Sequence, residues 1–325
     1  MESKVKYTAI QGSLGQVSDR YMPGGYNDDI SFTQIIKGLL EIKELDGIEI
    51  CHKYEGEASD PALIKELLKG SNVPVTFVHC NLFGERQWQN CSLSARDLET
   101  RKASIEQTKK TMDYAAAVGA PAMNLWLGQD GFDYPLCTDY KAQWNNLIES
   151  VRILADYNPE IRITLEGKLR EPRNRCLVDT SMTALLLALE TDRDNVGVAI
   201  DNGHVLQAGQ NIAQNIEIVA KYGKLFGMHV NDNYASWDDD MIFGSVHLTE
   251  LIEMFYSLRK VGFDKGLAVD IYPYRENQFR ATEECILNMI KINGMVDVIG
   301  WDTLTKLREE GDACEMTKTI REAIF

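Results

Sequence analysis

The sequence lacks any long apolar run. Among its 325 residues, no stretch approaches the ~18 consecutive apolar residues of a transmembrane helix. The amino-terminal segment MESKVKYTAIQG also has no apolar core of the kind found in secretory signals. We therefore expect a cytoplasmic protein without a membrane partner.

Positive charge is scarce. The chain has 34 lysines and arginines against 49 aspartates and glutamates, which gives a formal net charge of −15. Nucleic-acid binding requires basic surface that displaces counterions from phosphates, so the charge argues against a nucleic-acid partner. The acidity favours solubility and allows for a carboxylate cluster that binds a cation.

The seven cysteines have neither CxxC spacing nor the pattern of a disulfide framework. In a chain of this size they are expected to be reduced thiols. A thiolate metal site is not predicted.

Short β-rich segments alternate with longer segments of helical periodicity. The expected strands are Lys4–Gln11, Gly47–His52, Val73–Asn81, Ala122–Leu127, Arg162–Glu166, Gly197–Asp201, Leu225–Val230 and Gly266–Tyr272. Eight such units predict an α/β protein, a (β/α)8 TIM barrel formed by residues 1–294. Residues 295–325 are expected to be a C-terminal helical extension of the same domain, available for subunit contacts.

Four strand ends carry potential metal ligands. Glu166 ends the fifth predicted strand, Asp201 the sixth, His229 the seventh and Asp270 the eighth. A barrel brings these ends to one rim, and clustered carboxylates repel each other unless a cation holds them. Oxygen ligands with one imidazole favour Mn²⁺, Mg²⁺ or Co²⁺. Taken singly, each acid would be interpreted as a helix cap or a solvated loop residue.

Histidines follow a similar pattern. Four of the five end or follow a predicted strand: His52, His79, His204 and His229. The fifth, His247, opens a helix. A single histidine is usually structural, so the pattern matters more than any one member.

The loop after the seventh predicted strand reads HVNDNYASWDDDMIFG and contains Asp238 and Asp240. His204 follows Asp201 by three residues and can turn towards the same place. If Asp201 bridges two ions, then His204, Asp238 and Asp240 complete a second metal site. The alternative is an acidic solvated loop.

At these residues the sequence resembles the xylose-isomerase-like barrels, and within them the two-metal L-rhamnose isomerase type. The matching strings are NLWLGQDG, TLEGKLREP, AIDNGH, HVNDN…WDDD and AVDIY. The resemblance implies that Glu166 is a metal carboxylate and Lys168 a substrate-polarising lysine, and that Asp201 bridges the two metals. It also implies the roles of first-site ligands for His229 and Asp270, and of second-site ligands for His204, Asp238 and Asp240. The match covers the chain from about residue 122 onward.

We hypothesise an aldose–ketose isomerase with one or two Mn²⁺, Mg²⁺ or Co²⁺ ions per chain. A free sugar is expected because no glycine-rich phosphate cradle or arginine cluster is evident. One ion would fix the open-chain sugar. The other would acidify a water that shuttles the proton between O2 and O1 beside the catalytic Asp238.

Three further residues receive roles in this hypothesis. Lys168 would stabilise negative charge on O1, with an ion pair to the acidic rim as the alternative. His79 would assist ring opening as an acid or base, and Trp126 would form an apolar wall for the sugar. Each of the last two has a structural role as its alternative.

Several other functions remain open. The same barrel could serve a ketose 3-epimerase, although single-metal 3-epimerases lack the second site and end on a glutamate. It could also be the metal-dependent lyase subunit that cleaves an oxidised (3-keto) C-glycoside with a small partner subunit. An endonuclease would require three zinc ions and basic surface, and a sugar-binding barrel would leave Lys168 unexplained. We expect a homo-oligomer, either a dimer or a tetramer.

Overall fold

The eight predicted strands form one closed parallel barrel. The computed structural model describes residues 2–19 and 21–324. Around the barrel the strand order is β1-β10-β9-β8-β6-β4-β3-β2. The bounds are β1 (Lys6–Ile10), β2 (Gly47–Cys51), β3 (Val75–His79), β4 (Ala122–Trp126), β6 (Arg162–Glu166), β8 (Val196–Asp201), β9 (Leu225–Val230) and β10 (Gly266–Val269). The predicted (β/α)8 TIM barrel is confirmed, and strand ends differ from the prediction by at most three residues.

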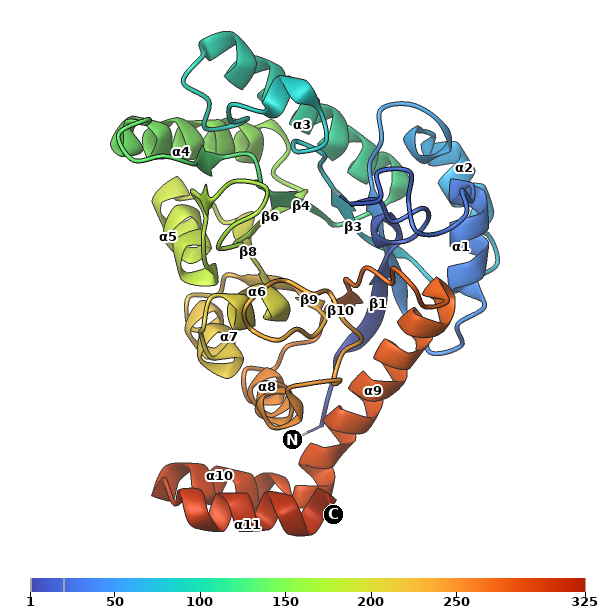
Figure 1. Cartoon of the computed structure of the whole chain (residues 1–325), viewed down its shortest axis with the longest axis vertical. Coiled ribbons are helices and arrows are strands. Elements are labelled where there is room, and N and C mark those ends of the chain that lie inside the picture. The colour runs from blue at the N-terminus through green and yellow to red at the C-terminus, as the bar shows by residue number, and fades with distance from the viewer. Residues whose placement is uncertain (1, 20, 325) are drawn as a thin grey trace.

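Helices surround the strands on the outside (Figure 1). They are α1 (Phe32–Leu40), α2 (Pro61–Leu67), α3 (Leu98–Val118), α4 (Tyr140–Tyr157), α5 (Ser181–Thr191), α6 (Asn202–Gln207), α7 (Ile212–Lys221), α8 (Leu248–Lys260) and α9 (Gln278–Ile299). Many begin at a side chain that accepts a hydrogen bond from the first turn; Asp97 does so for α3 and Asn277 for α9. No helix in the described ranges is long and apolar enough to cross a membrane.

Side-chain alternation along each strand separates the apolar core from the polar interior of the barrel. In β6, Ile163 and Leu165 are buried in the apolar core. The alternate residues Thr164 and Glu166 form polar contacts with Asn124 of β4. The last inward-facing position of β6 therefore delivers the carboxylate of Glu166 to one rim of the barrel.

The C-terminal helical extension is present as α10 (Trp301–Glu310) and α11 (Ala313–Ile324), which lie side by side beyond α8 and α9 (Figure 1). Trp301 stacks on Tyr256 of α8 with ring centroids 4.5 Å apart, which fixes the extension to the barrel. The boundary expected after residue 294 falls inside α9, which continues to Ile299.

A small antiparallel sheet of two short strands, which was not predicted, joins two rim loops. β5 (Gly131–Phe132), after β4, pairs antiparallel with β7 (Arg175–Cys176), after β6. A side chain at Gly131 would bring its Cβ within 2.1 Å of the carbonyl oxygen of Arg175, so close pairing requires glycine. This small sheet thereby holds the loop that follows Glu166 against the loop that follows β4.

Candidate metal centre

Four side chains from neighbouring strands converge at the carboxyl end of the barrel. Glu166 and Asp201 are the last residues of β6 and β8, His229 lies in β9, and Asp270 follows β10. One potential ligand atom of each lies within 4.8 Å of those of the other three. The structure thus brings together the four residues expected to form the first metal site, and their role as ligands stays a prediction.

The donor atoms suit a divalent cation. His229 Nδ1 is buried and makes no well-directed hydrogen bond, although it lies 3.3 Å from Glu166 Oε2 and 4.0 Å from Asp270 Oδ2. A buried imidazole nitrogen facing two carboxylates without a proton-sharing geometry is the arrangement that a metal ion would satisfy. Ser13 donates to Asp270 Oδ1 at 2.7 Å and so orients that carboxylate.

Charges within the cluster move its pKa values in opposite directions. Burial, together with the neighbouring carboxylates Asp238, Glu166 and Asp270, raises the pKa of Asp201 to about 6, against the pull of His204. Burial opposes ionisation of Glu166, but His229 and His204 hold the pKa of Glu166 below its usual range. A bound cation would remove the repulsion that Asp201 experiences.

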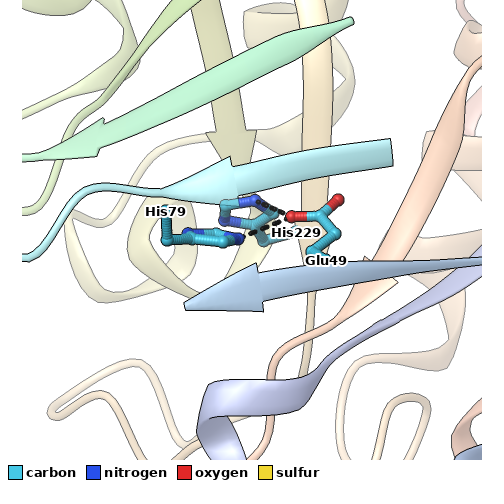
Figure 2. Close-up of side chains that lie close together, drawn as sticks. All are labelled: Glu49, His79 and His229. Carbon is cyan, nitrogen blue, oxygen red and sulfur yellow. Dashed lines mark hydrogen bonds and ion pairs between the residues drawn. The ribbon is translucent and has the colours of Figure 1, made fainter. Parts of the chain in front are cut away.

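A buried carboxylate outside the predicted set holds His229 from behind. Glu49, in β2, is 1% exposed, and its Oε2 lies 3.3 Å from His229 Nε2 and 2.7 Å from His79 Nε2 (Figure 2). Burial would raise the pKa of Glu49, but the two histidines hold it below its usual value. An ionised Glu49 favours a proton on His229 Nε2 and leaves Nδ1 as the metal-facing nitrogen. The donor atoms of Glu49, His79 and His229 also lie within 4.8 Å of one another, so these residues form an alternative ligand group, distinct from the predicted second metal site.

His79 uses both ring nitrogens in contacts with the protein. Its Nε2 faces Glu49, while its Nδ1 lies 3.3 Å from the side-chain amide nitrogen of Asn124. An amide nitrogen can only donate, so Nδ1 acts as the acceptor and Nε2 carries the proton. The ring-opening role of His79 stays a prediction, and it would require one of these contacts to break.

The residues expected at a second metal site lie beside the first group and are linked by ion pairs. His204 Nδ1 is 3.3 Å from Glu166 Oε1, and His204 Nε2 is 3.1 Å from Asp238 Oδ2. Lys168 Nζ lies 2.8 Å from the same Asp238 oxygen and 2.6 Å from Glu171 Oε2. The alternative expected for Lys168, an ion pair with the acidic rim, is therefore present.

The donor atoms of the predicted second metal site converge less closely than those of the four-ligand group. Among the described residues, the sets whose donor atoms gather within 4.8 Å do not include His204, Asp238 and Asp240. Burial opposes the charge on Lys168, but Asp238, Asp240 and Glu171 raise its pKa well above the usual value. Burial and the charge of Asp238 raise the pKa of Asp240. Lys168 thus compensates part of the negative charge of the acidic pair.

Asp232 closes the loop that carries these acids. It forms a bridge with Met241 through backbone hydrogen bonds of 3.0 and 2.8 Å, and its carboxylate accepts from the backbone of Val246 and His247. His247 Nδ1 also lies 2.8 Å from Asp232 Oδ1. The predicted start of a helix at His247 is confirmed, because His247 directly precedes α8.

His52 lies apart from the centre. It is buried beside α3, where its ring stacks on Tyr114 with centroids 4.3 Å apart and its Nδ1 is 3.0 Å from Thr111 Oγ1. Burial lowers the pKa of His52 to about 4. It therefore acts as a neutral structural residue.

A cavity of about 1150 Å³ opens over Lys168, Asp238 and Asp240. Trp126 lines the cavity and packs edge-to-face on Phe83, with the ring centroids 4.6 Å apart. Lys168 Nζ lies 5.2 Å from the centroid of the Trp126 ring. An arginine cluster is not evident in the sequence, but folding brings three of the described arginines to the wall of this cavity: Arg170, Arg173 and Arg275.

Known structures share this architecture over most of the chain. D-psicose 3-epimerase from Clostridium cellulolyticum H10 is 16% identical, with a TM-score of 0.68, over 89% of this chain and 99% of that one. The 3-keto-D-glucoside 4-epimerase from E. coli is 16% identical, with a TM-score of 0.66, over 89% and 100%. The IOLI protein with a bound zinc atom is 16% identical, with a TM-score of 0.67, over 89% and 98%.

The family profile described as "Xylose isomerase-like TIM barrel" matches residues 36–286, which is well over half of the sequence. The match spans β2 to β10 and includes every residue of the four-ligand group. The chain therefore belongs to the xylose isomerase-like TIM barrel family.

Proposed function

We propose that the protein is a divalent-metal-dependent isomerase that interconverts an aldose and a ketose. The observation that carries the proposal is the position of His204. Its two ring nitrogens lie 3.3 Å from Glu166 and 3.1 Å from Asp238, so a second acidic group adjoins the four-ligand group at the distance of one imidazole ring. Adjacent ligand groups of this kind suit two-ion chemistry on vicinal sugar oxygens.

The four-ligand group of Glu166, Asp201, His229 and Asp270 would hold the first cation, and His204, Asp238 and Asp240 would hold the second around a shared Asp201. The cations, when bound, would supply Lewis acidity at the C1 and C2 oxygens of the sugar. The isomerisation itself transfers hydrogen between C1 and C2 and a proton between O2 and O1.

Lys168 has a restricted part in this reaction. Its acidic neighbours hold its pKa far above neutrality, so it stays protonated and cannot serve as a base. Its ammonium can donate a hydrogen bond to O1 as negative charge develops there. Trp126, beside Lys168 on the cavity wall, offers an apolar face to the carbon side of the sugar.

A ketose 3-epimerase is the second candidate. It is favoured by the tight convergence of the four-ligand group alone, since a single cation between Glu166 and Asp270 would suffice to acidify a proton next to a carbonyl. The similar solved structures include epimerases of ketoses and of a keto-glucoside. The two candidates differ in whether the second acidic group is required.

The test is a screen of the Mn²⁺-reloaded protein on free aldoses and ketoses, among them L-rhamnose, L-lyxose, D-allose and D-xylose, followed by NMR at the anomeric and C2 positions. Aldose–ketose conversion that is lost in Asp238→Asn supports the isomerase. Inversion at C3 of a ketose without aldose formation, unaffected by Asp238→Asn, would replace it with the epimerase.

Binding of Mn²⁺, Mg²⁺ or Co²⁺ and homo-oligomeric assembly are part of the same proposal. Metal-content analysis of protein purified without added metal tests the first, and light scattering tests the second.

A further inference from the structure

Arg170 is a cavity-lining cation without a partner in the described part of the protein. It is only partly exposed, and its Nε is buried and makes no hydrogen bond. The described residues supply no ion pair to its guanidinium either. A buried guanidinium N–H without an acceptor costs free energy, and a ligand bound in the cavity could supply that acceptor.

The other basic residues that the structure describes on the cavity wall are engaged. Lys168 pairs with Asp238 and Glu171. Arg173 lies 3.2 Å from an Asp133 carboxylate oxygen and also donates to backbone carbonyls. Arg275 is exposed and lies over the ring of Tyr26 at 5.3 Å. In a chain with a net charge of −15, the lack of an ion pair or ring contact at Arg170 among the described residues distinguishes it from these neighbours.

The backbone after β6 determines where Arg170 points. Glu166, Lys168 and Arg170 occupy alternate positions, and both Lys168 and Arg170 line the cavity while Leu169 does not. Gly167 faces the opposite way, because a Cβ there would lie 2.4 Å from the carbonyl oxygen of Thr180. Lys168 and Arg170 therefore lie on the wall of one cavity, in the segment that leads away from Glu166 after β6.

At the rise of an extended strand, Arg170 is at most about 13 Å along the chain from Glu166. A sugar whose C1 and C2 oxygens lie at the metal centre would pass Lys168 and direct its far end towards Arg170. The residue thus occupies the position from which a substituent at the last carbon would be recognised.

We propose that Arg170 binds a carboxylate at the far end of the substrate, so that the sugar is a uronic acid or a related sugar acid. This inference rests on the proposed function for the orientation of the sugar. A guanidinium matches the planar geometry of a carboxylate and can form two parallel hydrogen bonds with it. A phosphate would require further free donors, and the neighbouring cations Lys168 and Arg173 are already paired.

The test compares D-glucuronate and D-galacturonate with the neutral sugars D-glucose and D-galactose on the full-length chain. Binding to the metal-free protein is measured by calorimetry, and conversion by the Mn²⁺-loaded protein is followed by NMR. The variants are Arg170→Gln and, as a matched control on the same cavity wall, Arg275→Gln. We expect Arg170→Gln to weaken uronate binding and kcat/KM by roughly 10- to 100-fold. Neutral sugars should change by less than about twofold, and Arg275→Gln should leave both classes at wild-type values.

Three results would overturn the carboxylate subsite. One is an equal loss for charged and neutral sugars in Arg170→Gln. Another is wild-type protein that treats uronates and neutral sugars alike. The third is an Arg170-dependent preference for D-glucose 6-phosphate over D-glucuronate, which would assign the residue to a phosphate.

The fate of the subsite can be separated from that of the isomerase. Neutral aldoses converted to ketoses regardless of Arg170, with no preference for uronates, would leave the isomerase standing without the subsite. Uronates that bind through Arg170 but undergo inversion at carbon without ketose formation would retain the subsite and reject the isomerase.

Discussion

Replacing Glu49 with glutamine should weaken metal binding although Glu49 is not one of the four proposed ligands of the first cation. Its carboxylate lies 3.3 Å from His229 Nε2 and 2.7 Å from His79 Nε2, and it is buried and ionised. Both imidazoles approach the same oxygen, and a glutamine oxygen in its place could still accept from both but carries no negative charge, so the variant removes the charge and keeps the shape.

The size of the effect follows from those two contacts. Removing a buried orienting partner of a metal-ligating histidine costs about 10- to 100-fold in metal affinity. A hydrogen bond to a charged acceptor contributes about 1.5–3 kcal/mol and one to a neutral acceptor about 0.5–1.5 kcal/mol, so weakening both bonds should lower the free energy of unfolding by roughly 2–3 kcal/mol. Calorimetric titration with Mn²⁺ measures the first quantity, and urea denaturation of the metal-free protein measures the second.

Asp130→Asn is the matched control. Asp130 is fully buried and accepts hydrogen bonds from the backbone of Ser92 and Ser94 at 3.1 and 2.7 Å, and its hydrogen-bond partners in the described part of the chain all lie outside the metal centre. It should lose stability and retain Mn²⁺ affinity. Equal weakening of Mn²⁺ binding in both variants would refute the orienting role. A Glu49→Gln protein that binds one ion fewer, at unchanged affinity for the rest, would instead make Glu49 a ligand.

Three other perturbations are informative. Asp238→Asn should reduce isomerase activity about 100-fold, with unfolding changed by no more than about 2 kcal/mol, because Glu171 still pairs with Lys168; unfolding as the main effect would contradict the second site. His52 has its pKa lowered to about 4, so between pH 6.5 and 4 the unfolded chain binds a proton that the folded chain does not. The free energy of unfolding should therefore decrease by up to about 3 kcal/mol as the pH is lowered through that window. Denaturation at a series of pH values should show a flatter pH dependence for His52→Gln. Parallel curves for the variant and the wild type would exclude His52 as the titrating group. Gly203→Ala should destabilise the fold measurably in thermal melts, because the new Cβ would lie 1.9 Å from Asn231 Oδ1; an unchanged Tm would contradict the close packing.

The barrel and its metal rim could be predicted because they depend on periodicities that the sequence displays directly. Apolar strand residues packed on helices fix the strands, and the last inward position then places Glu166, Asp201 and His229 at one end. Asp270 was expected at a strand end and lies one residue beyond β10. Strand boundaries were less certain because hydrophobicity marks the buried segment rather than the last ladder hydrogen bond.

Other parts of the site depend on contacts between residues far apart in the sequence. Glu49 is a single acid within the apolar strand GIEIC, and that isolation was the available signal for a buried functional carboxylate. Asp232 acts by bridging to Met241 and His247. The small β5–β7 sheet pairs only two residues of each strand. Arg170 could be recognised only after folding had assigned acids to its basic neighbours.

The most direct test of the account is anomalous diffraction at the manganese edge from a crystal of the Mn²⁺-loaded protein. The account predicts a strong peak among Glu166, Asp201, His229 and Asp270, and a second one beside His204, Asp238 and Asp240. A peak between Glu49, His79 and the Nε2 side of His229, with none at the four-ligand group, would contradict it.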